Sequence, residues 1–460
     1  MLEIAKQIFS GTSINITSRG RKYLGGFVGD EGARLEYANG IVNKWVDQLR
    51  VLAEIARSEP QAAYAAFVKG FQHKLSYHLR VIPNMDTLLA PLDNVIDNSL
   101  IPALTDGHVC SPDERLLLSL PVKLGGMAIP IFKNKAPIEY ANSRQACTQH
   151  VRNIKNQTLA YTFDDDEAAQ VRKDTNLQRK NSHDQIQATV VATLADDRLR
   201  AHNLSKLPGA SSWLTAMPLE EEQFTLNKRE FSDAVRLRYR WPLNRLPNTC
   251  PCGKDFDVDH ALNCLKGGLV NQRHKIIRNL FAYVMNEVHN DVSIEPLLMP
   301  LSGEQLPNSA NSANEARADV SVRGFWQDGQ KAFFDVKVFN PFAQCYIKSN
   351  IEKAFICNEK EKKREYNQRV IQLEHGTFSP LVFTPYGGSS RETEQVIRTL
   401  CAKVAAKRDL PYGTVVNWLR TKISFRLIRG AILCVRGSRD WRKREESLHL
   451  DEIELIDYTN

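Results

Sequence analysis

The sequence predicts a mainly α N-terminal half followed by an α/β C-terminal domain, in which a mixed four-strand sheet is flanked by helices. Apolar residues recur at helical spacing through most of the first 240 residues, whereas Val292–Leu298, Ala318–Val322 and Ala332–Phe339 alternate with period two. A fourth apolar run follows at 378–386. Helical segments stand before, between and after these runs, which is the element order of an α/β domain.

The N-terminal half is predicted to be helical after a short strand pair at 12–29. From Asp30 onward the pattern becomes helical, with an apolar stripe that includes Val42 and Trp45. Two capping-box sequences, Ser58–Gln61 and Ser111–Glu114, mark the starts of later helices. Residues 164–185 are strongly polar, so they predict a solvated helix or a linker between domains.

Length, charge and cysteine content restrict the class of protein. The chain has 460 residues, enough for about three domains of ~150 residues each. We see no membrane-spanning apolar run and no signal peptide, so we expect a nuclear or cytoplasmic protein outside the membrane. The net charge of +8 favours a polyanionic partner. Nine cysteines are too few for a disulfide scaffold, and those outside 250–264, Cys110 among them, are expected to be ordinary thiols.

Residues 250–264 predict a structural zinc site. Cys250, Cys252, His260 and Cys264 have C-x-C-x7-H-x3-C spacing, which places the last two one helical turn apart. Thiolate and imidazole ligands in this number suit a tetrahedral Zn²⁺ ion. The alternative is a chance cluster in a reduced protein, and His274 is a lesser candidate for the fourth ligand. We therefore predict a zinc knuckle after the basic amphipathic helix at 227–240.

Three charged residues on the predicted strands suggest a second kind of metal site. Asp335 and Lys337 are two apart and share one face of their strand, and Asp319 reaches the same end of the sheet if the hairpin pairs in register. Two carboxylates and a lysine can hold a divalent cation and a water for metal-assisted phosphodiester hydrolysis. The alternative is that all three charges lie on the solvated face of a hairpin.

Two basic clusters suggest contact with phosphate. Both lie on predicted helices, at 271–288 and at 417–444. A basic stripe is either a solvated face or a phosphate-binding surface, and beside a nuclease site we favour the second interpretation. The residues concerned are Arg273, His274 and Arg278 in the first helix, and Lys422, Arg426 and Arg429 in the second.

The element order from residue 271 on, together with Asp319 and Asp335-Val-Lys337, resembles the PD-(D/E)xK restriction-like nuclease fold. With the knuckle upstream, the chain is similar to the C-terminal portion of non-LTR retrotransposon polyproteins that carry a restriction-like endonuclease. The similarity covers nearly the whole chain and is weakest between about 160 and 220. It is carried by INITSRGRKYLGG, ERLLLSLPVKLGGMAIP, RHKIIRN, IEPLLMPLSGE, ADVSVRGFW, FFDVKVFNP and SPLVFTPYGG.

The resemblance implies roles for the residues of the nuclease motif. Asp319 and Asp335 would bind Mg²⁺ or Mn²⁺, and Lys337 would orient or activate the attacking water. Glu295 is a weaker candidate for a third acid. Candidates for phosphate contact after the third strand are Lys348, Tyr366 and Arg369.

The same resemblance implies a division of the chain into five parts. These are a helical remnant of the region after a reverse-transcriptase palm (1–160), a polar linker (161–225), the basic helix and knuckle (226–268), the endonuclease domain (269–444) and an acidic tail (445–460).

Some features depart from the family pattern. The palm and its paired aspartates are absent, so we expect no reverse-transcriptase activity. Ala318 replaces the usual proline before the first aspartate, and only one residue separates the first two knuckle cysteines. Expected partners are target DNA, the element RNA and a separate palm-bearing chain.

Three functions remain to be separated at this stage. The favoured one is a DNA endonuclease that nicks its target. The second is an inactive nucleic-acid-binding remnant of a truncated element. The third is a polymerase accessory fragment whose helical half docks to a separate palm.

Overall fold

The computed structural model describes residues 2–14, 16–157, 164–299 and 316–439. Contacts divide the chain into two compact units, one formed by Met1–Leu194 and Leu226–Ser232, the other by Ala195–Thr225 and Asp233–Asn460. The predicted domain boundary at 160, the Asn/Ser-rich spacer between the first two predicted strands, and the acidic tail all lie outside the described residues.

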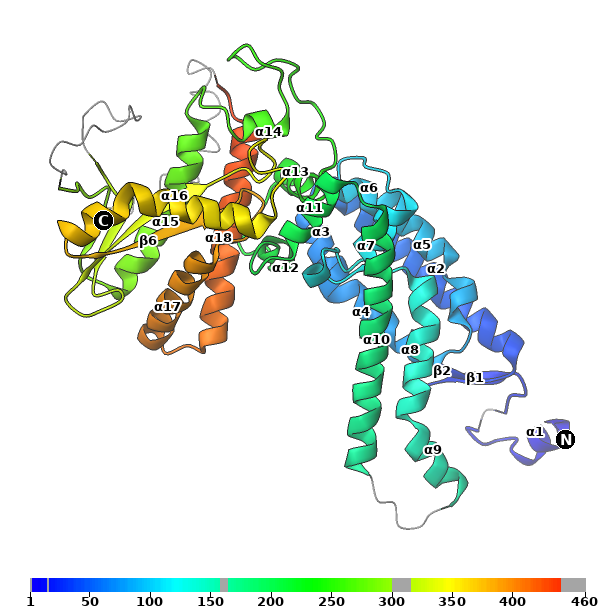
Figure 1. The fold of residues 1–460 in the computed structure, drawn as a ribbon. Coiled ribbons are helices and arrows are strands. Elements are labelled where there is room, and N and C mark those ends of the chain that lie inside the picture. Colours follow the sequence, from blue (N-terminus) through cyan, green and yellow to red (C-terminus); the bar gives the residue numbers. More distant parts are fainter. Residues whose placement is uncertain (1, 15, 158–163, 300–315, 440–460) are drawn as a thin grey trace. The chain divides into compact units, whose positions relative to one another are not determined.

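The first unit is helical apart from one hairpin, as predicted (Figure 1). Strands β1 and β2 pair antiparallel, and short π-helical and 3-10 segments lie among the helices that follow. The elements are α1 (Leu2–Ile8), β1 (Gly20–Tyr23), β2 (Gly26–Gly29), α2 (Glu31–Ala56), α3 (Pro60–Ala66), η1 (Phe67–Phe71), α4 (Gln72–Val81), η2 (Met85–Leu88), α5 (Ala90–Val95), η3 (Ile96–Leu100), α6 (Ile101–Leu104), α7 (Pro112–Ser119), η4 (Val122–Leu124), α8 (Phe132–Ala146), α9 (Thr148–Lys155) and α10 (Asp165–Thr193).

Side chains cap the starts of α2, α7 and α10 in the described part of this unit. Asp30 accepts a hydrogen bond from the Ala33 N–H at 2.8 Å, which fixes the start of α2. The capping box at Ser111 is confirmed, with reciprocal bonds between Ser111 and Glu114. The box predicted at Ser58 is wrong, because its hydroxyl donates to the Ile55 carbonyl at 3.1 Å and so belongs to the end of α2.

The polar stretch expected as a linker or solvated helix is the 29-residue helix α10. It contacts α7 and α8, and Figure 1 shows it running alongside α8. Arg179 of α10 binds Glu139 of α8 at 3.1 Å. The helix is therefore part of the first unit, held there by charged groups, and the polar composition reflects the solvated remainder of its surface.

The second unit contains a mixed four-strand sheet with the order β3-β4-β5-β6. The strands are β3 (Val292–Ile294), β4 (Val320–Arg323), β5 (Lys331–Val338) and β6 (Thr377–Phe383). β3, β4 and β5 pair antiparallel in chain order, whereas β6 returns parallel to β5 after the long helix α16 (Ile351–Gln372). The predicted mixed sheet flanked by helices is confirmed.

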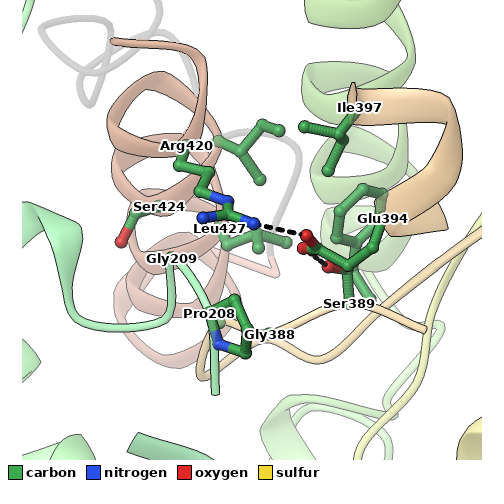
Figure 2. Close-up of a pocket in the computed structure, with 12 residues that line it drawn as sticks. Pro208, Gly209, Gly388, Ser389, Glu394, Ile397, Arg420, Ser424 and Leu427 are labelled. Atoms are coloured by element: carbon green, nitrogen blue, oxygen red, sulfur yellow. Dashed lines mark hydrogen bonds and ion pairs between the residues drawn. The ribbon is translucent and has the colours of Figure 1, made fainter. Parts of the chain in front are cut away.

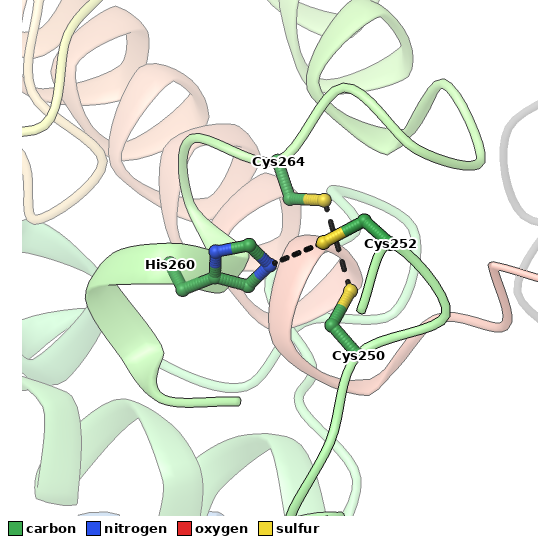
Figure 3. A group of neighbouring side chains, drawn as sticks. All are labelled: Cys250, Cys252, His260 and Cys264. Atoms are coloured by element: carbon green, nitrogen blue, oxygen red, sulfur yellow. Dashed lines mark hydrogen bonds between the residues drawn. The ribbon is translucent and has the colours of Figure 1, made fainter. Parts of the chain in front are cut away.

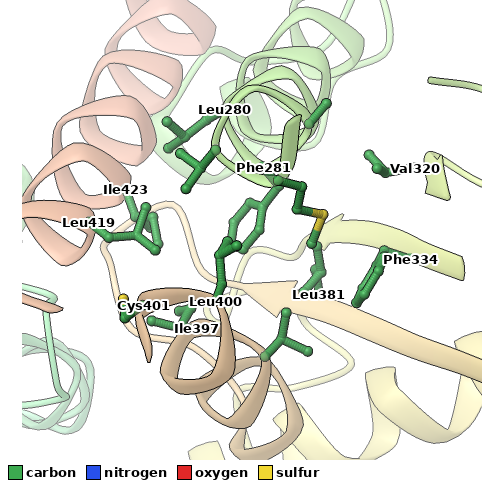
Figure 4. Close-up of a cluster of buried hydrophobic side chains, with 14 of the residues drawn as sticks. Leu280, Phe281, Val320, Phe334, Leu381, Ile397, Leu400, Cys401, Leu419 and Ile423 are labelled. Carbon is green, nitrogen blue, oxygen red and sulfur yellow. The ribbon is translucent and has the colours of Figure 1, made fainter. Parts of the chain in front are cut away.

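Helices cover both faces of this sheet. One face buries Val320, Phe334 and Leu381 against α15 (Leu269–Val288), α17 (Arg391–Arg408) and α18 (Tyr412–Arg436), as Figure 4 shows. The opposite face packs Phe333 and Phe378 against α16. The remaining helices are α11 (Asp196–Ser205), α12 (Ser212–Thr215), α13 (Lys228–Tyr239, shared between the two units) and α14 (Val258–Ala261).

The alternation of β5 decides which side chains meet α16. Ala332, Phe334 and Val336 enter the core of α15, α17 and α18, so the residues between them face the other way. Phe333 begins that second row, and Asp335 and Lys337 continue it along the side covered by α16. The predicted shared face of Asp335 and Lys337 is thus present in the sheet.

Candidate functional site

Asp319, which directly precedes β4, lies beside Asp335 of β5. The register pairs Val320 with Phe334, and the Asp319 N–H donates to the Phe334 carbonyl at 3.0 Å. The Asp319 carboxylate also accepts a hydrogen bond from the Val336 N–H at 2.6 Å. Both aspartates are buried, at 8% and 4% exposure. The hairpin therefore brings the two predicted metal-binding carboxylates together, as the sequence predicted for an in-register pair.

Burial and repulsion from its neighbour change the proton affinity of Asp335. Removal from water, and next the negative charge of Asp319, raise the pKa of Asp335 to about 6. Lys362 and His274 oppose the rise. Two buried carboxylates at one point create a demand for positive charge, which a divalent cation can meet.

His274 binds the first of these carboxylates. Its Nε2 atom lies 2.7 Å from Oδ1 of Asp319, so α15 supplies one of the groups that hold this side chain. His274 was predicted as a phosphate contact and, less strongly, as a fourth zinc ligand. The structure places its ring at the carboxylate pair instead, and the fourth thiolate or imidazole position of the knuckle is filled by other residues.

One lysine contacts the carboxylate pair, and it is not the lysine that the motif predicted. Lys337, predicted from the motif, directs its Nζ atom to Glu361 at 2.7 Å. Lys362 of α16 directs its Nζ atom to Asp335 at 3.0 Å and to Glu365 at 3.1 Å. Burial disfavours its charge, but Asp335 and Glu365 together raise the pKa of Lys362. Lys362 was missed, because its position beside Asp335 depends on how α16 packs on the sheet.

Three predicted accessory residues have other surroundings. Tyr366 is 9% exposed and its ring stacks on Phe378 with centroids 5.3 Å apart. Burial and the nearby Asp335 raise the pKa of Tyr366, so its hydroxyl stays protonated beside the site. Arg369 is only 2% exposed, so the prediction that it contacts phosphate is wrong. Lys348 is exposed and its predicted role stays a prediction.

Glu295 lies near the pair through its backbone. Its N–H donates to the Asp319 carbonyl at 2.9 Å, and its φ of 51° marks a sharp change of chain direction. Its carboxylate forms an ion pair with Arg278 rather than turning to the other acids. The predicted phosphate contact by Arg278 is wrong for the same reason: its side chain is 9% exposed and its guanidinium binds Glu295 and Asn279.

The predicted knuckle residues come together in space. One ligand atom from each of Cys250, Cys252, His260 and Cys264 lies within 4.8 Å of all the others (Figure 3). The Cys250 and Cys264 sulfurs are 3.7 Å apart, and the Cys252 sulfur is 3.3 Å from His260 Nε2. Ligand atoms of a tetrahedral zinc ion stand roughly 3.4–3.8 Å apart. This group is therefore able to hold a metal ion such as zinc.

A tight hairpin and a short helix build the knuckle. The Cys250 N–H donates to the Lys254 carbonyl at 2.8 Å, and Gly253 turns the chain with a φ of 87°. Asp257 then caps α14 by accepting from the His260 N–H at 2.6 Å. The turn aims both cysteines of the C-x-C sequence toward His260, so the shortened spacing is compatible with a shared ion.

Hydrogen bonds join the knuckle to the end of β5. Asp259 accepts two bonds from Arg240, at 3.1 and 2.8 Å, and lies 3.3 Å from the Asn340 amide. Arg273 donates to the carbonyls of Leu262 and Val338 at 3.1 and 3.0 Å. Arg273 is only 2% exposed, so its predicted contact with phosphate is wrong. Its buried guanidinium instead connects the knuckle to β5.

The basic side of α18 binds another segment of the same unit. Lys422 pairs with Glu222 at 2.9 Å, and Arg426 donates to Gln223 at 2.6 Å. Arg429 donates to the Thr225 carbonyl at 2.5 Å. The prediction that these three cations face phosphate is wrong, because their charged groups fasten residues 222–225 to α18.

A small cavity lies between α17, α18 and the chain around Gly209 (Figure 2). Glu394 closes it by binding Arg420 and Ser389, each at 2.6 Å. Its volume of about 10 Å³ is room for about one water molecule. The cavity is thus too small to bind a substrate.

No protein-family model matches the chain, and no curated protein is significantly similar to it. Within the described part of the chain, no helix combines the length and apolarity that crossing a membrane requires. The functional interpretation therefore depends on the sites themselves.

Proposed function

We propose that the second unit is a metal-dependent DNA endonuclease that nicks its target, and that the chain derives from a non-LTR retrotransposon protein. The observation that supports this most strongly is the buried pair Asp319 and Asp335, with lysines 337 and 362 beside it. Acid pairs of this kind suit a hard divalent cation with oxygen ligands. The restriction-like sheet of the proposal corresponds to β3–β6 with helices on both faces.

Asp319 and Asp335 would hold Mg²⁺ or Mn²⁺. Such an ion, when bound, neutralises phosphate charge and makes a hydroxide nucleophile available near neutral pH. The chain's own groups prepare the site for this chemistry. The Val336 N–H and His274 fix the orientation of the Asp319 carboxylate, while Lys362 offsets the charge of Asp335.

Lys337 is proposed to act on the attacking water or the phosphate. Its partner Glu361 is half-exposed, so water screens their attraction and the pair is easily exchanged. Once released from Glu361, the Lys337 ammonium can donate hydrogen bonds to a water or to a phosphate oxygen. That group would lie two residues along β5 from Asp335. The two lysines thus have different roles. Lys362 balances the charge of Asp335, and Lys337 donates hydrogen bonds to the reacting groups.

The outer face of α16 is the best candidate for contact with the DNA backbone. Lys353, Lys360 and Arg364 are exposed there, and no described carboxylate pairs with them. The first and last of them are eleven positions apart along the helix, roughly 16 Å. Beside them, Lys363 and Asn367 help line an open hollow of about 590 Å³. Positive groups in this arrangement suit phosphate contacts without base readout.

The knuckle is proposed to hold structural zinc. Its three thiols and imidazole form a closed ligand set, with no position left for substrate. The bonds from Asp259 and Leu262 to the end of β5 suggest that the ion stabilises this part of the second unit. Element RNA and a separate palm-bearing chain are further proposed partners, which co-purification from cells would reveal.

A plasmid-nicking assay tests the nuclease proposal. Wild-type protein with Mg²⁺ or Mn²⁺ should convert supercoiled plasmid to the open circle, whereas Asp319→Ala and Asp335→Ala should abolish nicking and retain DNA binding. Asp328→Ala, an exposed acid of the same hairpin, is the matched control and should remain active. Nicking by both alanine variants at the wild-type rate would reject the site. No nicking by wild type with any divalent ion would favour the inactive binding remnant.

A further inference from the structure

A second cluster of metal-binding side chains lies in the first unit, in the loop between α6 and α7. His108, Cys110 and Glu114 each offer one ligand atom, and these atoms lie within 4.8 Å of one another. The three residues supply one nitrogen, one sulfur and one oxygen. All three lie outside the proposed nuclease and knuckle residues, so an explanation of this cluster is independent of the proposed function.

The backbone brings the first two side chains to the same side. Asp106 and Gly107 reverse the chain with φ values of 52° and 87°, and the Gly107 N–H donates to the Pro102 carbonyl at 2.8 Å. Val109 is 74% exposed, and His108 and Cys110 on either side of it are partly buried toward α7.

The third side chain is fixed by the start of α7. Glu114 accepts a hydrogen bond from the Ser111 N–H at 2.9 Å within the capping box. Its carboxylate also lies 3.1 Å from Nε2 of His108, and the two side chains are only 9% and 15% exposed. Carboxylates that bind metals are commonly hydrogen-bonded in this way, because the second bond orients the ligand.

The pairing of His108 with Glu114 does not account for Cys110. A capping box needs only Ser111 and Glu114, and a histidine–carboxylate bond needs no thiol. A thiol, an imidazole and a carboxylate that converge in a partly buried loop form the mixed set found at zinc sites with an open coordination position. The loop is therefore organised as a ligand set rather than as a cap alone.

We propose that His108, Cys110 and Glu114 form a second metal site, for Zn²⁺ or an ion of similar ligand preference, with water completing the coordination. On binding, the Cys110 sulfur forms a bond to the ion and its proton leaves to solvent. His108 would bind as the tautomer protonated at Nδ1, so that an Nε2 lone pair replaces the N–H directed at Glu114, and Glu114 keeps its bond from the Ser111 N–H. The site would tie the α6–α7 loop to the first turn of α7.

The number of ions bound by the full chain tests this proposal. Native mass spectrometry and cobalt titration should give two equivalents of tightly bound ion for wild type in the absence of Mg²⁺. Cys110→Ser and His108→Ala should each give one, and the cobalt spectrum should lose the contribution of a single-thiolate site. Cys147→Ser, which removes an exposed cysteine of the same unit, is the control and should keep both ions.

A further variant separates ligation from folding of the loop. Glu114→Gln retains a side chain able to complete the capping box but lacks the negative charge. Without zinc, Glu114→Gln should therefore unfold at the same temperature as wild type. It should bind the second ion at least tenfold more weakly than wild type does. Equal numbers of bound ions in wild type, Cys110→Ser and His108→Ala would overturn the proposal, whether or not the knuckle is occupied.

Discussion

Lys362 of α16 places its ammonium 3.0 Å from the carboxylate of Asp335, in the position where a cation is most needed. A divalent ion that binds Asp319 and Asp335 must compete with this ammonium. Lys362 is therefore expected to weaken metal binding while it keeps the metal-free site electrically balanced. This ion pair joins helix α16 to the sheet. A metal ion that displaces the Lys362 ammonium would therefore also affect the position of the helix.

Replacing Lys362 by methionine should strengthen metal binding. Lys362→Met keeps the length of the side chain and removes the competing charge, so affinity for Mn²⁺ should rise by about tenfold, or ~1.4 kcal/mol. Mn²⁺ titration followed by electron paramagnetic resonance measures this change. Lys363→Met is the control, because Lys363 pairs with Glu392 at 2.6 Å and leaves Asp335 untouched. Equal Mn²⁺ affinity in Lys362→Met and wild type would show that the ammonium does not compete.

The raised pKa of Asp335 predicts a specific dependence of stability on pH. Since its folded-state pKa is about 6 against an ordinary 3.8, the folded protein binds more protons between these values. The free energy of unfolding should therefore fall as pH rises from about 4 to about 6. Asp335→Asn, which resembles the protonated acid, should be more stable than wild type at pH 8 by on the order of 1–3 kcal/mol.

Urea unfolding in EDTA at pH 4.5 and pH 8 tests this dependence. The stability difference between Asp335→Asn and wild type should be large at pH 8 and small at pH 4.5. Asp328→Asn, on the exposed turn, should show no such difference at either pH. A variant that is less stable than wild type at pH 8 would mean that the bond to Lys362 outweighs burial and the repulsion from Asp319.

The sequence predicted the part of the site that depends on one hairpin. Period-two alternation placed Asp335 and Lys337 on one face, and antiparallel pairing then brought Asp319 alongside. Lys362 and His274 come from helices far away in sequence, so their positions depend on how those helices pack on the sheet. No local pattern contains that information.

Basic residues were the least reliable guide, for a physical reason. A guanidinium can donate hydrogen bonds to a carbonyl, a carboxylate or a phosphate, and the sequence does not show which of these it meets. Arg273 and Arg429 therefore could not be distinguished in the sequence from DNA-binding residues. By contrast, three thiols and an imidazole within fifteen residues have few functions in combination other than binding a metal ion. The knuckle residues were accordingly placed together correctly, while the arginines were not.

Loss of the knuckle ion should loosen a defined part of the second unit. Cys252→Ser removes one thiolate, so the hairpin and α14 should exchange amide hydrogens faster over residues 248–264. Because Asp259 and Leu262 connect the knuckle to Asn340 and Arg273, protection should also fall at the end of β5. Hydrogen-exchange mass spectrometry with and without a chelator measures both effects, and DNA affinity should fall in parallel.

The matched control for the knuckle is Cys345→Ser, which removes an exposed cysteine of the same unit. It should show wild-type exchange and bind the same amount of zinc. Protection in the core strands β4 and β5 around Phe334 should persist in Cys252→Ser, since that core is packed by α15, α17 and α18. Unfolding of the whole unit would contradict a local role for the ion, and absence of zinc from purified wild type would reject the site.

Two sets of cations should respond differently to neutralisation. The outer face of α16 carries Lys353, Lys360 and Arg364, all exposed, whereas the matched set on α18 is fastened to residues 222–225. If the α16 set contacts phosphate, its replacement by glutamine should reduce the salt slope of duplex binding by up to about 2.7, or ~0.9 for each contact. Fluorescence anisotropy in EDTA, over a range of salt concentrations, measures that slope without cleavage.

Replacing Lys422, Arg426 and Arg429 of α18 by glutamine should have the opposite effect to the α16 replacement, changing stability and not DNA binding. Its salt slope should equal that of wild type, but its free energy of unfolding should fall by about 1–3 kcal/mol, because partly buried carbonyl and amide oxygens lose their donors. Segment 222–225 should also become more sensitive to proteolysis, since α18 no longer holds it. A reduced slope in this variant together with an unchanged slope in the α16 variant would move the DNA-binding surface from α16 to α18.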